Sequence, residues 1–154
     1  MNSTTAEAIL TVVAQQNREH RHRDALKILD IVVEEAPDHQ GFRIARGVTH
    51  MHFHEWAKAL ADFQHAAKVG EMSPELEVNL GEVELNCGDF KSGVNRLLRI
   101  LKDTRVPHTE LEDQPAVHRR AGFVLATFQR LASNLKTPSA SHGSTDTPAP
   151  SQAS

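Results

Sequence analysis

The sequence predicts an all-α fold in which helical hairpins stack side by side. Three observations support this prediction: small residues recur at a fixed interval of 34 residues, large apolar residues recur at the same interval, and no stretch alternates apolar and polar residues for long enough to form a strand. The repeated positions are Ala25, Ala59 and Gly93; Leu29, Phe63 and Leu97; Val32, Ala66 and Ile100; and Leu26, Leu60 and Val94. A 34-residue period built from two short helical patterns is typical of a solenoid of helical hairpins.

Six helices are expected in three hairpins, and local signals mark several of their ends. The expected helices span residues 4 to 17–20, 22–35, 39–52, 56–69, 74–87 and 90–102. The first begins after Ser3 or Thr4, and Glu7 can complete a capping box there. Pro37 stops the second helix, and Gly70 is expected as a left-handed cap of the fourth.

The third hairpin and the three turns have signals of their own. Ser73 and Pro74 are expected as the N-cap and the first residue of the fifth helix. His20, His54 and Gly88 share one phase of the 34-residue period. Because that phase falls between the two helices of a hairpin, we expect these three residues at equivalent turn positions.

A seventh helix is expected after a polar connection over residues 104–114. Asp113, Gln114 and Pro115 signal its start, and it should occupy about 114–135. Its apolar stripe consists of Val117, Ala121, Val124, Phe128, Leu131 and Leu135. Because a solenoid leaves the face of its last hairpin bare, this helix is expected to cap it. Residues 136–154 are mainly Ser, Thr, Pro, Ala and Gly, a composition that predicts a disordered tail after a helical domain over 1–135.

The chain resembles tetratricopeptide repeat (TPR) proteins over about residues 6–103. The small residue that this motif requires midway along the first helix of each hairpin is Gly47 in the second repeat and Gly81 in the third, whereas the first repeat has Val13. Only Pro37 matches the motif's helix-ending proline. The resemblance implies three TPR-like helical hairpins that form a short right-handed solenoid, closed by a C-terminal capping helix. These repeats would span about 6–39, 40–73 and 74–107.

Composition and charge argue against several classes of partner. The chain has 154 residues, of which 39% are hydrophobic and 24% charged, as expected of one soluble domain. Its formal net charge of -3 gives no electrostatic case for binding nucleic acid or an anionic membrane. The single cysteine, Cys87, cannot form an internal disulfide, which fits a reducing, cytoplasmic compartment. The N-terminal residues resemble neither a secretion signal nor a membrane span.

Histidines are the one hint of metal chemistry. His50 and His54 stand four apart on one helix face, a spacing that can hold zinc, whereas His52 points elsewhere. No obvious third ligand accompanies them, so polar turn and helix-end roles are the preferred interpretation, with a metal-binding protein as a minor alternative. Glu82 and Glu84 lie on different sides of a helix, and no phosphate loop or nucleophile motif is present. We therefore expect neither enzymatic activity nor a cofactor.

Binding is the remaining class of function, and the TPR resemblance implies where it occurs, because in that family the first helices of the hairpins line a concave groove. The corresponding positions here are Leu10, Ala14, Asn17, Arg18, Ile44, Val48, Met51, His52, Val78, Glu82, Leu85 and Asn86. Leu10 and Ala14 stand where TPR adaptors for the acidic C-termini of heat-shock chaperones need Lys and Asn. An aliphatic groove with a flexible methionine instead favours a partner segment with apolar anchors, bound as an extended strand or an amphipathic helix. Packing between hairpins is the alternative role for Ile44, Val48, Val78 and Leu85.

The layout as a whole resembles the TPR chaperones of bacterial type III secretion. Three repeats, a capping helix, an acidic chain and an apolar groove are shared with that family, and segments 72–76 and 86–90 are similar to its sequences. The resemblance implies a cytoplasmic chaperone that holds a translocator, needle or export-apparatus subunit soluble before export. Such a chain could also form a homodimer. A generic TPR scaffold or regulatory adaptor is the alternative.

Overall fold

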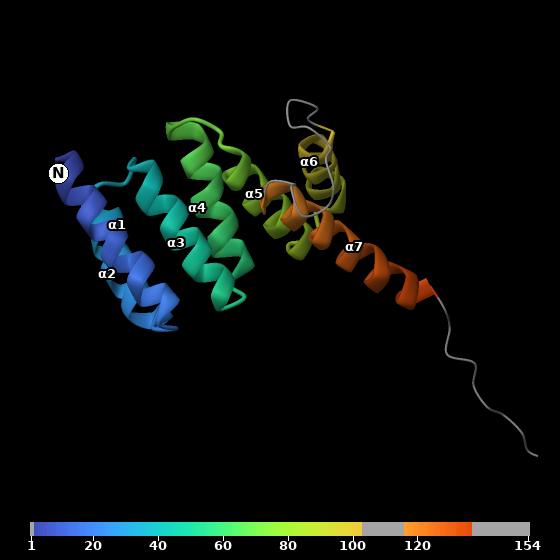
Figure 1. Cartoon of the computed structure of the whole chain (residues 1–154), viewed down its shortest axis with the longest axis horizontal. Coiled ribbons are helices and arrows are strands. Elements are labelled where there is room, and N and C mark those ends of the chain that lie inside the picture. Colours follow the sequence, from blue (N-terminus) through green and yellow to red (C-terminus); the bar gives the residue numbers. More distant parts are fainter. Residues whose placement is uncertain (1, 103–115, 137–154) are drawn as a thin grey trace, which may run out of the picture.

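The structure is a computed structural model of the chain, and it describes residues 2–102 and 116–136. Within these ranges the chain forms seven α-helices and no strand (Figure 1), which confirms the all-α class. The helices are α1 (Ser3–Arg18), α2 (His22–Glu35), α3 (Gln40–His52), α4 (Trp56–Val69), α5 (Pro74–Asn86), α6 (Phe90–Leu101) and α7 (Ala116–Lys136). The connection expected over 104–114 and the tail expected after residue 136 lie outside the described residues.

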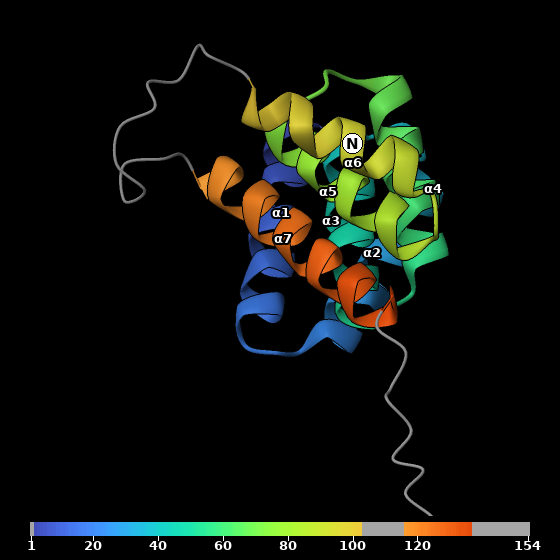
Figure 2. The same cartoon turned by 90° about the vertical axis from the view of Figure 1, so that its right-hand side faces the viewer.

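The first six helices pair in sequence into three hairpins that stack in chain order (Figure 1). Neighbouring hairpins meet through α2 with α3 and through α4 with α5, and the first helices also touch one another, α1 with α3 and α3 with α5. Helix α7 packs on α5 and α6 and lies across them in Figure 2. One face of the stack is therefore lined by first helices, and α7 closes its C-terminal end.

The 34-residue pattern forms the interior of each hairpin. The large repeated residues Leu29, Phe63 and Leu97 are fully buried. A Cβ atom added at Gly47 would lie 2.6 Å from the Phe63 ring, and one added at Gly81 would lie 2.8 Å from the Leu97 side chain. The small residue midway along the first helix is therefore required because the large residue of the second helix fills the space beside it.

All three hairpin turns use the same left-handed backbone conformation. The φ angle is 59° at His20, 56° at His54 and 90° at Gly88. Histidine is among the residues that adopt this region more often than most non-glycine residues. The three residues that share one phase of the 34-residue period therefore occupy equivalent turn positions, as expected.

The start of α1 differs from the expectation. Asn2 is the N-cap, and its Oδ1 accepts a hydrogen bond from the backbone N–H of Thr5 at 2.8 Å. The Glu7 carboxylate accepts a hydrogen bond from the hydroxyl of Ser3 at 3.0 Å. Both residues lie within the helix, so Glu7 does not complete a capping box. The expected cap at Ser3 or Thr4 was wrong because an asparagine one residue earlier satisfies the free N–H groups equally well.

The end of α4 also differs from the expectation. Gly70 is extended, with φ −150° and ψ −171°, and is not a left-handed cap. The side chain of Gln40 takes over the capping role, because its Nε2 donates to the carbonyls of Ala66 at 3.1 Å and Glu71 at 2.7 Å. A Cβ atom at position 70 would lie 2.3 Å from the end of the Gln40 side chain, so a larger residue there would displace this cap; the backbone itself has no positive φ.

Buried charges tie the helices of the second and third hairpins together. In the second, Asp62 of α4 accepts hydrogen bonds from Arg43 at 2.9 Å and from Arg46 at 2.8 Å, both on α3. In the third, Glu84 of α5 accepts two hydrogen bonds from Arg96 of α6, at 3.0 and 2.9 Å. Arg96 stands 34 residues after Asp62, so the charges are reversed between the two hairpins.

Helix α7 covers the end of the stack with its N-terminal half. Ala121, Val124 and Leu125 are buried in one cluster with Val78 and Leu85 of α5. Leu131, which belongs to the predicted apolar stripe, is 54% exposed. The stripe is therefore buried only in its first part, and α7 extends beyond the hairpin that it covers (Figure 1).

Candidate partner-binding groove

Two adjoining hollows follow the face that the first helices line. The first, which we name the α1–α3 pocket, has a volume of about 320 Å³ and is lined by Leu10, Val13, Ala14, Asn17, Gly41, Ile44, Ala45 and Val48. The second, the α3–α7 pocket, has a volume of about 480 Å³ and is lined by Val48, Met51, His52, His54, Trp56, Glu82 and Arg120. Val48 belongs to both pockets, so together they form one groove that runs from α1 to α7.

The α1–α3 pocket is apolar because its one polar side chain is turned to the protein. Asn17 donates from Nδ2 to the hydroxyl of Thr49 at 3.2 Å, and its Oδ1 lies 3.0 Å from Nδ1 of His22. Gly41 allows the side chain of Leu10 to approach, since a Cβ there would lie 3.0 Å from Leu10 Cδ1. The pocket thus presents aliphatic carbon with no unpaired polar group, which suits an aliphatic side chain of a partner.

The α3–α7 pocket carries one ion pair in its wall. Arg120 of α7 donates from Nη2 to Glu82 at 2.6 Å and from Nη1 to Asn79 at 2.7 Å. The Arg120 side chain remains 43% exposed, so part of the guanidinium faces solvent. The α7 end of the groove is therefore polar but nearly neutral, whereas Met51 and Trp56 add apolar surface to the same pocket.

His52, which lines the same pocket, stacks on the imidazole of His22 behind it. The rings of His22 and His52 are parallel, with 4.0 Å between their centroids. Burial, together with the neighbouring His22 and His20, lowers the pKa of His52 below its usual value. His52 is therefore neutral at pH 7 and contributes an uncharged aromatic surface to the groove.

The histidine pair considered as a metal site does not converge. Nδ1 of His50 lies 2.6 Å from the Glu55 carboxylate, and its ring is buried against α4. His54 sits at the turn and lines the groove. In the part of the chain that the structure describes, no group of three or more His, Cys, Asp or Glu side chains is arranged to hold a metal ion.

The structure brings most of the predicted groove residues together. Those that line the two pockets are Leu10, Ala14, Asn17, Ile44, Val48, Met51, His52 and Glu82. Val78 and Leu85 do not line it: they are 1% and 2% exposed and are buried with residues of α6 and α7, and not between hairpins as the alternative interpretation had it. Arg18 points along α1 and donates to Gln15, and Asn86 lines a different pocket.

Six residues that line the groove were not among the predicted ones: Val13, Gly41 and Ala45 in the α1–α3 pocket, and His54, Trp56 and Arg120 in the α3–α7 pocket. Arg120 lies on α7, outside the 34-residue period, so no repeat position could identify it. His54 and Trp56 stand at the turn between α3 and α4, and their side chains face the groove from the end of the hairpin. Their position next to the turn was visible in the sequence, but the direction of their side chains was not.

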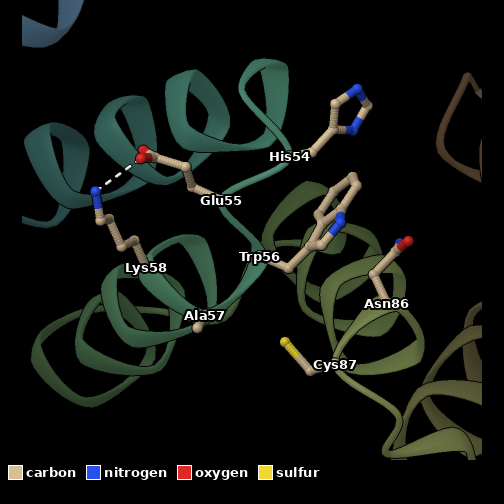
Figure 3. A pocket seen from close by; sticks show the side chains of 7 residues that line it. All are labelled: His54, Glu55, Trp56, Ala57, Lys58, Asn86 and Cys87. Carbon is tan, nitrogen blue, oxygen red and sulfur yellow. Dashed lines mark hydrogen bonds and ion pairs between the residues drawn. The ribbon is translucent and has the colours of Figure 1, made fainter.

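A third hollow lies at the hairpin turns, where α4 begins and α5 ends. This edge pocket has a volume of about 570 Å³ and is lined by His54, Glu55, Trp56, Ala57, Lys58, Asn86 and Cys87 (Figure 3). It shares His54 and Trp56 with the α3–α7 pocket. The sulfur of Cys87 points towards Trp56 in Figure 3.

The fold defines a TPR-like helical-hairpin protein with a groove along its first helices. No protein-family model matches the sequence, and no curated protein matches it. In the described residues, no helix has the length and apolar character needed to cross a membrane.

Solved structures with this fold include type III secretion translocator chaperones. The chaperone SycD of Yersinia enterocolitica superposes with a TM-score of 0.66 at 14% identity, covering 86% of this chain and 89% of SycD. SycD in complex with a peptide of the translocator YopD gives 0.64 at 14% identity, with 85% and 97% covered. PcrH in complex with the chaperone-binding region of PopD gives 0.63 at 16% identity, with 88% and 96% covered. The fold of this chain is therefore the TPR-like fold of SycD and PcrH.

Proposed function

We propose that this chain is a non-enzymatic chaperone of a type III secretion system that acts in the cytoplasm and binds an apolar segment of a translocator in the groove. The observation on which this proposal depends is the groove itself, in which an aliphatic α1–α3 pocket continues into the α3–α7 pocket. Two structures of the same fold contain a translocator segment, from YopD and from PopD, which supports the choice of partner. A translocator segment kept unfolded before export exposes apolar side chains, and a groove that covers them prevents aggregation.

The partner is expected to supply apolar side chains and few charges. The α1–α3 pocket has no free polar group, and the only charged side chains of the α3–α7 pocket, Glu82 and Arg120, pair with each other among the described residues. A buried charge on the partner would lose its hydration without gaining a counter-ion in the first pocket. Apolar anchors therefore fit the groove better than the carboxylates recognised by other TPR adaptors.

A peptide-binding experiment tests this function. Fluorescein-labelled peptides tiled across the translocators encoded in the same genome are titrated with the full chain, and fluorescence polarisation reports binding. Val48 borders both pockets and is partly exposed, so Val48→Glu places a carboxylate in the apolar wall. Because Val48 also packs against the core of the second hairpin, the melting temperature of the variant is measured beside its affinity. Because an unpaired buried carboxylate costs several kcal/mol, affinity should fall by about a hundredfold or more.

The control reverses a charge away from the groove. Glu34 is exposed on α2, and Glu34→Lys should leave the affinity nearly unchanged at moderate salt. If no translocator peptide binds, or if Glu34→Lys abolishes binding while Val48→Glu does not, the chaperone proposal is wrong. Binding to a folded regulatory protein instead would favour the alternative of a TPR scaffold or adaptor.

A further inference from the structure

The groove does not stop at the end of α3. The α3–α7 pocket and the edge pocket share two wall residues, His54 and Trp56. The rings of these residues lie against each other, with 5.3 Å between their centroids (Figure 3). The indole of Trp56 therefore borders both hollows, and a chain that follows the groove past Met51 can reach the edge pocket along this ring.

The edge pocket offers an apolar surface because its charged groups are already paired. Lys58 donates to Oε1 of Glu55 at 2.7 Å, and Oε2 of Glu55 lies 2.6 Å from Nδ1 of His50. The Asn86 amide donates to the carbonyl of Glu82 at 2.8 Å. These contacts leave the indole of Trp56, Ala57 and the thiol of Cys87 as the surface that a ligand would touch.

From this continuity we propose that the partner segment leaves the groove over Trp56 and places an aliphatic or aromatic side chain in the edge pocket, against the indole and the Cys87 thiol. This inference rests on the proposed function, since the same segment occupies both places. The inference predicts the sequence pattern of the segment. It should have apolar side chains for the α1–α3 pocket, polar or apolar ones beside Arg120, and one more apolar side chain for the edge pocket.

The chain provides its own reporter for this site. Cys87 is the only cysteine in the sequence, and it is exposed in the free protein. Alkylation by iodoacetamide therefore reports access to the edge pocket directly. Because burial raises the pKa of the Cys87 thiol, the reaction is run at mildly alkaline pH, where the thiolate is sufficiently populated.

The experiment compares alkylation of the full chain with and without a saturating concentration of the translocator peptide that binds tightest. Glu34→Cys adds a second thiol on the exposed side of α2, and mass spectrometry of digested protein measures both sites in one molecule. The rate at Cys87 should fall severalfold when the peptide is bound, and the rate at the introduced thiol should not change. Shortening the peptide from the end that reaches the edge pocket should remove the protection while polarisation still detects binding in the groove.

Two variants test the same contact by affinity. Trp56→Leu removes the ring from between the pockets and should weaken binding of the full-length peptide by about tenfold, and that of the shortened peptide, which still touches this ring in the α3–α7 pocket, by less. Cys87→Glu places a charge in the edge pocket at an exposed position, so it tests the site even if Trp56→Leu destabilises the fold. Binding in the groove with unprotected Cys87 would overturn this inference and leave the proposed function intact. Absence of any peptide binding would overturn both.

Discussion

Asp62 keeps its charge although only 2% of its surface is exposed. Burial alone would raise its pKa, but hydrogen bonds from Arg46 and Arg43 outweigh that effect and hold the pKa below its usual value. Arg46 also pairs with Asp30 of α2 at 3.2 Å, so one arginine connects three helices. The carboxylate of Asp62 is thus the centre of the contacts among α2, α3 and α4.

Neutralising this carboxylate should be costly. Asp62→Asn leaves two arginines without their buried counter-ion, and removing one partner of such a buried pair costs about 3 to 5 kcal/mol of unfolding free energy. Urea denaturation at pH 7 measures this loss. A midpoint within error of the wild type would mean that the arginines are solvated in the folded protein and that the cluster contributes little.

The same carboxylate gives stability a dependence on acid pH. Its pKa is lower in the folded than in the unfolded chain, so its contribution is complete above about pH 4 and disappears as the pH falls through the folded pKa. The Asp62→Asn variant lacks this carboxyl group, so it does not have the contribution at any pH. The decrease in thermal midpoint between pH 7 and pH 3 should therefore be smaller in the variant than in the wild type, and equal decreases would contradict the assignment.

At the scale of helices, two backbones approach each other closely in the third hairpin. A Cβ at Gly93 of α6 would lie 2.8 Å from the carbonyl oxygen of Gly81 on α5. That oxygen belongs to the backbone and cannot rotate away, so Gly93→Ala should separate the helices and cost about 1 to 3 kcal/mol. Gly122 of α7 has no atom within 4 Å of its would-be Cβ, so Gly122→Ala should instead stabilise by up to about 1 kcal/mol.

Thermal denaturation of the two glycine variants distinguishes these effects. Helix propensity alone predicts that both substitutions stabilise, whereas the backbone contact predicts opposite signs. If Gly93→Ala raises the melting temperature, the two helices do not approach each other as the structure places them.

The six helices of the hairpins could be predicted from the sequence because their period repeats a physical requirement. Each pairing of a small and a large residue, such as Gly47 with Phe63, recurs wherever two helices must interlock. Most of the residues that line the two pockets were expected from the resemblance to TPR proteins, which places a groove along the first helices. Helix α7 was expected as a cap, but the sequence could not reveal that it buries Val78 and Leu85 and supplies Arg120, because those contacts join residues outside the period.

Helix ends were less predictable for a similar reason. The cap of α4 is the side chain of Gln40, which belongs to α3. The residues next to Gly70 in the sequence give no sign of this partner, which lies 30 residues earlier in the chain. The buried network of Asp62 was also missed. Charged residues in an amphipathic pattern are normally assigned to the solvent face, and only the packed structure shows that they face one another.

At the scale of the molecule, α7 protects the end of the stack. It covers Val78 and Leu85 with Val124 and Leu125. A chain that ends at Lys102 would expose this surface and lose about 3 to 6 kcal/mol from the two α7 side chains alone. Its unfolding midpoint should fall and its light scattering should rise, since a newly exposed apolar patch promotes association.

A longer truncation product is the matched control. A chain that ends at Lys136 retains α7, and its midpoint should stay within error of the full chain, because residues 137–154 have a composition that cannot bury a core. Equal stability of both truncated chains would mean that α7 is not a cap. Loss of stability in both would assign a structural role to residues 137–154.

The reversed charges of the second and third hairpins make their helices unsuitable for exchange. Glu77 and Arg96, which pair at 3.7 Å, occupy the positions that Arg43 and Asp62 hold one repeat earlier. If α6 took the place of α4 beside α3, its arginine would meet two arginines, and α4 beside α5 would set aspartate against glutamates. Charge repulsion would therefore oppose the wrong pairing, although the repeated apolar positions of α4 and α6 are nearly the same. A polypeptide built from identical repeats would keep the packing but lose this discrimination. The different charges of the two repeats therefore help to specify that α3 pairs with α4 and α5 with α6.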